Sequence, residues 1–148
     1  MGTINFTTTL LVDQSPKAVF NAINQPQNWW SGEIEGNSAK LNDEFTYRYK
    51  DFHMSRQRIV ELIPDQKIVW LVTDSQINYT EDINEWTGTK ISFEITEKGD
   101  KTELRFAHIG LVPEIECFES CSGAWTQLIN VGLFSLITTG ETEKVDLG

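Results

Sequence analysis

The sequence predicts an α+β domain in which a curved antiparallel sheet wraps around one long C-terminal helix, with two short helices after the first strand. Apolar and polar residues alternate in one run near the N-terminus and in several runs between residues 43 and 108, as in half-buried strands. Short turn signals separate most of these runs and favour antiparallel pairing. After Pro113 the apolar spacing changes from that of a strand to that of a helix, which indicates an amphipathic helix.

The chain is large enough for one domain. It has 148 residues, of which 39% are apolar and 23% are charged. A chain of this size buries roughly 70% of its unfolded surface on folding, so it needs neither disulfides nor a metal to fold. No repeat or linker divides the sequence. We therefore expect a single domain over residues 1–138, followed by a polar C-terminal tail over residues 139–148.

Local signals predict the N-terminal elements. Residues 3–12 form a strand, because alternate positions place one set of side chains on one face: Ile4, Phe6, Thr8, Leu10 and Val12. Ser15 followed by Pro16 is typical of a helix start, and this helix ends near Asn24 before Pro26. The next segment carries two adjacent tryptophans between a proline and a glycine, where neither a long helix nor a long strand fits.

About six strands are expected in total. Besides the first, they lie near residues 43–49, 54–63, 68–73, 89–96 and 102–108. Pro64 begins a turn between two of these runs, and Gly99 lies in the hairpin loop before the last strand.

The predicted C-terminal helix begins at Pro113, with acidic residues in its first turn as the helix dipole favours. Its apolar stripe is formed by Ile115, Phe118, Cys121, Trp125, Leu128, Ile129, Gly132, Leu133 and Leu136. A stripe this wide indicates that one face of the helix packs against the sheet.

The formal net charge of −10 disfavours two classes of partner. Binding to a nucleic-acid backbone requires clustered cations, and anionic lipid headgroups repel an acidic surface, so we expect no nucleic-acid partner and no membrane partner. The N-terminal residues lack the cationic and apolar regions of a signal peptide, and the cytoplasm is the expected location.

Metal and cofactor chemistry is not expected. The two cysteines, Cys117 and Cys121, and the two histidines lack the spacings of a zinc site, so we expect reduced, packed cysteines rather than a metal site or redox pair. The chain has no glycine-rich phosphate loop and no hydrolase or metalloprotease motif. No cofactor, metal ligand or catalytic residue is assigned.

Several segments, read in order, resemble one family. They are residues 15–23, Trp30, residues 59–70 with Pro64 in the turn, residues 102–111 and residues 123–128. Together they resemble the START/Bet v 1-like (SRPBCC) superfamily, and within it the family named for the C-terminal domain of the activator of the Hsp90 ATPase. The resemblance covers nearly the whole chain. It implies a helix-grip fold, whose members bind lipids, sterols, polyketides or hormones between helix and sheet. It supplies no shared catalytic residues.

Ten residues are candidates for contact with a ligand in that space: Trp30, Tyr47, Tyr49, Arg58, Trp70, Phe93, Phe106, His108, Cys121 and Trp125. The aromatic members either fill the core or form the apolar wall of a pocket. Small residues on the helix stripe, Cys121 and Gly132, would leave room for a ligand.

The polar candidates have alternatives too. His108 shares the inward strand face with Phe106, where it is either a satisfied core group or a group that orients or protonates a ligand. Arg56 and Arg58 share one strand face; an inward arginine would pair with a ligand carboxylate, whereas a bulge would turn both outward into solvent. His53 is expected in a loop or at a strand end, where it is either solvated or lines a pocket mouth.

Three functions follow from these predictions. The leading one is binding of a small hydrophobic or amphipathic molecule between the C-terminal helix and the sheet. The alternatives are a cyclase or hydrolase-like enzyme that uses His108 as acid or base, and a chaperone-interaction module. A single domain disfavours the last without excluding a chaperone partner, and exposed aromatic residues leave a homodimer open.

Overall fold

The computed structural model describes residues 5–30, 32–50, 53–77, 86–112 and 118–141. The strands are β1 (Phe6–Val12), β2 (Glu33–Gly36), β3 (Glu44–Tyr49), β4 (His53–Ile63), β5 (Lys67–Ile77), β6 (Lys90–Lys98) and β7 (Lys101–Ile109). The helical segments are α1 (Pro16–Ile23), the short 3-10 helix η1 (Pro26–Asn28), and a C-terminal helix made of α2 (Phe118–Gln127), the π-helical η2 (Leu128–Leu133) and α3 (Phe134–Thr139).

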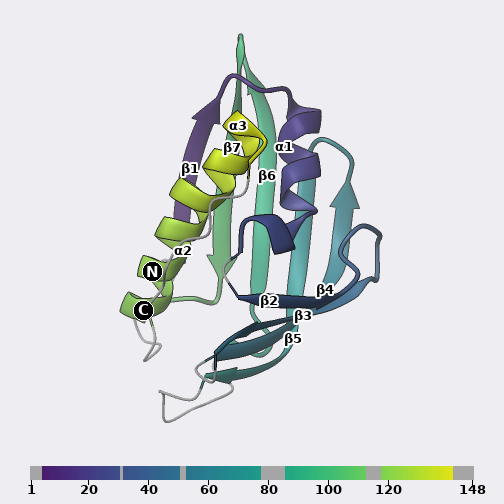
Figure 1. Cartoon of the computed structure of the whole chain (residues 1–148), viewed down its shortest axis with the longest axis vertical. Helices are drawn as coiled ribbons and strands as arrows, with labels where there is room; N and C mark the ends of the chain where they lie inside the picture. Colours follow the sequence, from purple (N-terminus) through teal and green to yellow (C-terminus); the bar gives the residue numbers. More distant parts are fainter. Residues whose placement is uncertain (1–4, 31, 51–52, 78–85, 113–117, 142–148) are drawn as a thin grey trace.

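The strands form one antiparallel sheet with the order β1-β7-β6-β5-β4-β3-β2. The helical segments lie over the same face of this sheet, and the C-terminal helix runs beside β1 and β7 (Figure 1). The predicted α+β class and helix-grip arrangement are therefore confirmed. In the part of the chain that the structure describes, no helix is long and apolar enough to cross a membrane.

Helix α1 begins as the sequence predicts. The Ser15 hydroxyl accepts a hydrogen bond from the backbone N–H of Ala18 at 3.2 Å, and Pro16 occupies the first turn. Val19 and Ile23 have no exposed surface, so one face of α1 anchors it to the sheet. The helix ends at Asn24, and η1 follows directly.

Strand β2 is the element that the sequence analysis missed. It has four residues, and Ile34 is its only large apolar side chain, so it shows no alternating pattern. It pairs with β3, and glycines with positive φ lie just before it and at its end: Gly32 at 116° and Gly36 at 110°. A Cβ on Gly36 would lie 2.5 Å from the Glu44 carbonyl oxygen, so only glycine allows this approach to β3.

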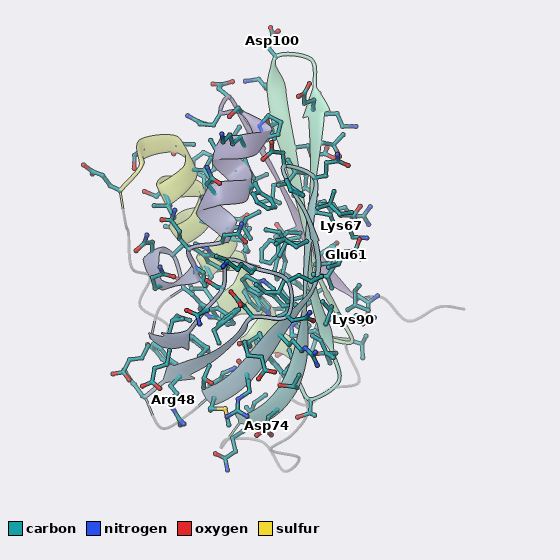
Figure 2. The ribbon with its side chains drawn as sticks, turned by 90° about the vertical axis from the view of Figure 1, so that its right-hand side faces the viewer. Arg48, Glu61, Lys67, Asp74, Lys90 and Asp100 are labelled. Atoms are coloured by element: carbon teal, nitrogen blue, oxygen red, sulfur yellow. The ribbon has the colours of Figure 1, made fainter. Side chains whose placement is uncertain are left out.

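The two faces of the sheet differ sharply in chemistry. The face toward the helices carries the apolar core, whereas the opposite face carries charged side chains such as Glu61, Lys67 and Lys90 (Figure 2). Irregular pairing interrupts β4, with register shifts between Arg56 and Gln57 and between Ile59 and Glu61. A bulge changes which alternate residues face the core.

The register shift between Ile59 and Glu61 explains why Arg56 and Arg58 lie on the opposite face from Leu62. Arg56 and Arg58 are exposed on the outer face, while Ile59 is fully buried and Leu62 packs against the core. The inward positions next to Ile59 are taken by Ser55 and Gln57, both without exposed surface. The outward alternative for the two arginines is the one that the structure shows.

The C-terminal helix buries one face, as predicted. Its buried residues are Cys121, Trp125, Leu128, Ile129, Gly132, Leu133 and Ile137. The buried position near the C-terminal end of the helix differs from the predicted Leu136, because the π-helical turn rotates each residue beyond it around the helix axis. Ile137 is therefore buried, while Leu136 only packs against the edge of the core. Pro113 and Ile115, predicted to begin the helix, lie outside the described residues.

Candidate functional site

A layer of stacked aromatic rings occupies the space between the sheet and the C-terminal helix. Trp30, which follows η1, lies in the middle of it. Its ring stacks on Tyr47 of β3 with centroids 4.0 Å apart and lies 5.1 Å from Trp125 of α2. All three side chains are at most 3% exposed. Residues far apart in the sequence thus meet at one point in the interior.

The neighbouring strands β5, β6 and β7 continue this layer. Trp70 lies 4.9 Å from Phe93, and Phe93 lies 5.3 Å from Phe106 with which it pairs across the strands. Phe106 in turn lies 4.7 Å from Trp125 on the helix. Trp70, Phe93 and Phe106 have no exposed surface. Ring against ring therefore fills the interior along these contacts.

His108, at the end of β7, is the polar centre of the layer. Its Nδ1 accepts a hydrogen bond from the Trp125 indole Nε1–H at 3.0 Å. Its Nε2 lies 2.8 Å from the Thr89 hydroxyl, and that hydroxyl donates to the Trp86 carbonyl oxygen at 2.6 Å. Because the Thr89 proton is already used, His108 Nε2 carries the hydrogen and donates it to Thr89.

This network keeps His108 neutral. The ring has no exposed surface, and burial, helped by the nearby His53, lowers the pKa of His108 from 6.5 to about 3. Gly110 makes the arrangement possible, because a Cβ there would lie 2.6 Å from the Thr89 methyl group. With both ring nitrogens bonded inside the protein, His108 holds Trp125 and Thr89 in place and has no nitrogen left for a ligand.

Two residues beyond the ten candidates complete the site. The His53 ring, at the start of β4, lies edge-on to Trp86 with centroids 4.4 Å apart, and Trp86 stacks on Trp125 at 5.9 Å. His53 is partly buried rather than solvated, and burial lowers its pKa from 6.5 to about 4. Its Nε2 and the Trp86 indole nitrogen are buried and have no hydrogen-bond partner among the described residues.

The layer contains further buried polar atoms of this kind. The indole nitrogens of Trp29 and Trp70 and the side-chain oxygen of Gln57 also lack a partner in the described part of the chain. Buried polar groups in proteins are nearly always bonded, so a cluster of exceptions calls for an explanation, such as a bound molecule. Trp29 contacts Trp30 and Trp70, which places it in the same layer.

The remaining candidates lie at or beyond the margin of the layer. Tyr49 is half-buried, and the Lys50 ammonium lies 5.3 Å from its ring centre. Arg58 lies on the outer face, where its guanidinium reaches Asn42 Oδ1 at 3.4 Å, so it does not belong to the interior site. Cys121 is 4% exposed and faces the core.

The structure has Cys121 in a disulfide rather than as a reduced, packed thiol. Cys117, the other cysteine of the chain, lies outside the described residues. Spacing alone did not distinguish these states, because both fit two sulfurs on neighbouring turns of one helix. Among the described residues, no three histidine, cysteine or acidic side chains gather in a way that would hold a metal ion.

Comparison with known proteins fits this architecture. A family model described as activator of Hsp90 ATPase homolog 1-like protein matches residues 13–133. The chain belongs to this family. The match runs from just before α1 to the end of η2 and so includes Trp29, Trp30, Trp86 and Trp125. No curated protein matches the chain.

Solved structures show the same fold at low sequence identity. The Aha1 dimer from Colwellia psychrerythraea superposes with a TM-score of 0.73 at 21% identity, covering 93% of this chain and 98% of that one. A protein from Staphylococcus saprophyticus gives 0.70 at 15% identity, covering 98% and 100%. A conserved protein of unknown function from Enterococcus faecalis gives 0.68 at 19% identity, covering 98% and 78%.

Proposed function

We propose that this member of the activator of Hsp90 ATPase homolog 1-like family binds a small apolar or amphipathic molecule between its C-terminal helix and the inner face of its sheet. The observation that carries the proposal is the combination of an aromatic interior with buried polar atoms that lack partners. An apolar molecule suits the first, and a polar atom at one end of that molecule suits the second.

The polar end of the ligand is best placed at Trp86 and His53. The Trp86 indole nitrogen can only donate, and a ligand oxygen that accepts from it would offset the cost of burying this group, about 1 to 3 kcal/mol. The His53 ring lies edge-on to the same indole, and its Nε2 also has no hydrogen-bond partner among the described residues. His108, which the sequence analysis favours for this role, is already bonded on both sides.

The apolar part of the ligand would lie along the rings next to Trp86. Trp125 stacks on Trp86, and Phe106 contacts Trp125, so a molecule anchored at Trp86 reaches the apolar layer without a gap. Since these rings already contact one another, the ligand replaces some ring contacts with its own. Aromatic ligands therefore suit the site better than long flexible chains.

The test measures binding of 2-naphthol, an aromatic molecule with one hydroxyl group, by isothermal titration calorimetry. Trp86→Phe removes the indole N–H but keeps an aromatic ring, and we expect it to weaken binding about fivefold, equivalent to about 1 kcal/mol. Trp29→Phe is the comparison variant, because it also removes an unpartnered indole N–H of the layer, but from a ring that contacts Trp30 and Trp70 rather than the polar end at Trp86. We expect it to weaken binding less than Trp86→Phe does. Equal affinity in the parent and Trp86→Phe, or no binding to the parent, would contradict the proposal.

The geometry does not favour the enzymatic alternative. An acid or base needs a nitrogen within reach of the substrate, and both nitrogens of His108 are occupied. A homodimer stays a proposal; it is supported by the Aha1 dimer among the similar structures, and light scattering of the purified protein would test it.

A further inference from the structure

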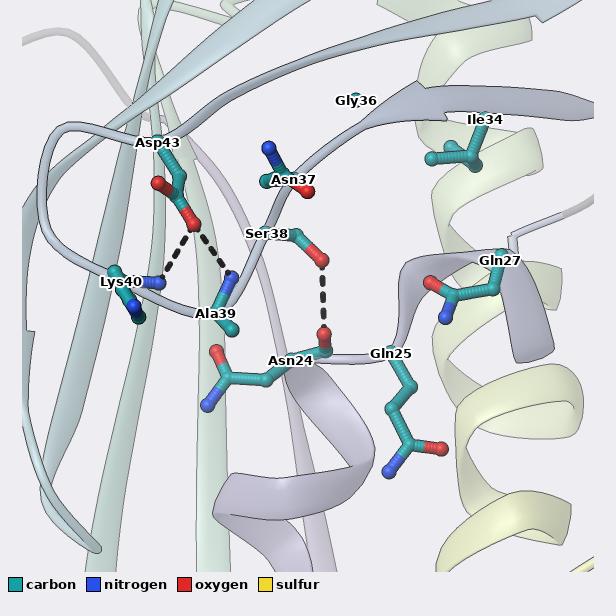
Figure 3. A pocket seen from close by; sticks show the side chains of 10 residues that line it. All are labelled: Asn24, Gln25, Gln27, Ile34, Gly36, Asn37, Ser38, Ala39, Lys40 and Asp43. Carbon is teal, nitrogen blue, oxygen red and sulfur yellow. Dashed lines mark hydrogen bonds between the residues drawn. The ribbon is translucent and has the colours of Figure 1, made fainter.

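A second hollow lies apart from the aromatic layer. It is a pocket of about 670 Å³ between the end of α1 and η1 on one side and β2 with the following loop on the other (Figure 3). Four carboxamide side chains line it, Asn24, Gln25, Gln27 and Asn37. Its size is within the range of small-molecule sites. We call it the amide pocket.

The amide pocket has unused hydrogen-bonding capacity. Asn24 Oδ1 is buried and has no partner among the described residues. Gln25 Oε1 accepts from Asn28 Nδ2 at 2.7 Å, which fixes the Gln25 amide and leaves its N–H groups as donors. Donors and acceptors therefore occur side by side on this wall.

The opposite wall is a sheet edge. In the β2–β3 ladder, Asn37 N–H donates to the Glu44 carbonyl at 3.1 Å, and Ile34 is paired with Tyr47. Hydrogen-bonded and non-hydrogen-bonded pairs alternate in an antiparallel ladder, so Ile34 forms a non-hydrogen-bonded pair. Its backbone N–H and C=O consequently point away from β3. Since β2 is the last strand of the sheet, these groups lie along its free edge, and Ile34 is also one of the residues that line the pocket.

Local hydrogen bonds fix the loop that lines one end of the pocket. The Ser38 hydroxyl donates to the Asn24 backbone carbonyl at 2.9 Å and so ties the loop after β2 to the end of α1 (Figure 3). One oxygen of the Asp43 carboxylate accepts from the backbone N–H groups of Ala39 and Lys40. A pocket of this size holds only a short segment of a peptide.

The charge of the lining selects a neutral ligand. Lys40 and Asp43 are the charged residues among those that line the pocket, and they are of opposite sign. The other polar side chains are amides and a serine hydroxyl. A carboxamide presents one acceptor and adjacent donors, which matches a peptide group, and a free strand edge pairs with extended peptide backbone.

We propose that the amide pocket binds a short, uncharged peptide segment in extended conformation. One residue of the ligand pairs with the backbone of Ile34, and its next peptide group bonds to the carboxamides of Gln25 and Asn37. This site is distinct from the proposed binding of an apolar molecule, since no ring of the aromatic layer lines it.

The experiment is an NMR titration of the ¹⁵N-labelled protein with acetyl-Ala-Ala-methylamide, a neutral blocked dipeptide. We expect saturable shifts of the Ile34 backbone amide and of the Gln25 and Asn37 side-chain amides. Gln25→Ala and Asn37→Ala remove exposed side chains and should each raise the dissociation constant about fivefold. Gln76→Ala, an exposed amide on β5 outside the pocket, is the matched control and should leave it unchanged.

Three results would overturn the proposal. One is the absence of saturable shifts at Ile34 in the parent protein. Another is equal affinity of the parent, Gln25→Ala and Asn37→Ala, which would show that the pocket amides do not bind the peptide. The third is binding of trehalose but not of the dipeptide at these positions, which would assign the pocket to polyhydroxyl ligands instead. Unperturbed spectra of the variants away from the pocket establish that they are folded.

Discussion

Acidification from pH 7.5 to pH 5 is expected to destabilise the fold through its two histidines. Burial lowers the pKa of His108 to about 3 and that of His53 to about 4, against 6.5 for the unfolded chain. Over this pH range the unfolded chain binds a proton at each site and the folded chain does not. The stability that the two neutral histidines contribute is therefore fully present above pH 6.5, and it is lost as the pH falls toward their pKa values in the folded protein.

The size of the loss depends mainly on the unfolded pKa, because both folded values lie below pH 5. Each proton bound only by the unfolded chain lowers the free energy of unfolding by about 1.36 kcal/mol for each pH unit below 6.5. At pH 5 each histidine therefore lowers it by about 2 kcal/mol, and the pair by about 4 kcal/mol.

Urea unfolding followed by tryptophan fluorescence between pH 7.5 and 5 measures this slope directly. His53→Gln should remove about half of the pH dependence, and His108→Gln the other half, whatever each does to the stability at pH 7.5. A parent protein equally stable at pH 7.5 and 5, or a slope unchanged in His53→Gln, would refute the assignment of neutral buried histidines.

Three further substitutions test other parts of the structure. Gly36→Ala should lower the free energy of unfolding in urea by at least about 2 kcal/mol, because its Cβ would lie 2.5 Å from the Glu44 carbonyl oxygen. Gly99→Ala, at a position with positive φ but open space, should lower it by about 1 kcal/mol. Equal losses would argue against the tight approach of β2 to β3. Thr89→Val leaves the His108 N–H without an acceptor and should cost about 1 to 3 kcal/mol, and a neutral effect would exclude the bridge. Arg58→Ala should change the 2-naphthol dissociation constant less than twofold, since Arg58 lies on the outer face; a larger loss would place it in the site.

The aromatic layer was largely predictable from strand periodicity. Alternation correctly places Phe93, Phe106 and His108 on the inward face, and helical spacing does the same for Trp125. Regular periodicity holds wherever pairing is regular, as it is between β6 and β7. Trp30 was predicted from the resemblance to the family rather than from any period.

The rest depends on features that a period does not describe. The orientation of Arg58 depends on the irregular pairing of β4, and β2 is too short to show alternation. The contact of His53 with Trp86 joins segments 33 positions apart, and the role of His108 depends on Thr89 and Gly110, whose importance appears only with the backbone in place. For these parts of the site, the sequence offered only the adjacent Trp29 and Trp30 and a histidine, His53, near the start of a strand.

Native mass spectrometry of the purified protein, compared with its denatured mass, tests the proposed binding most directly. We expect the native protein to carry an extra small molecule, retained from the cell or supplied as 2-naphthol, and expect Trp86→Phe to retain less of it than Trp29→Phe does. A native mass equal to the denatured mass in the presence of 2-naphthol, for the parent and both variants alike, would contradict binding between the helix and the sheet.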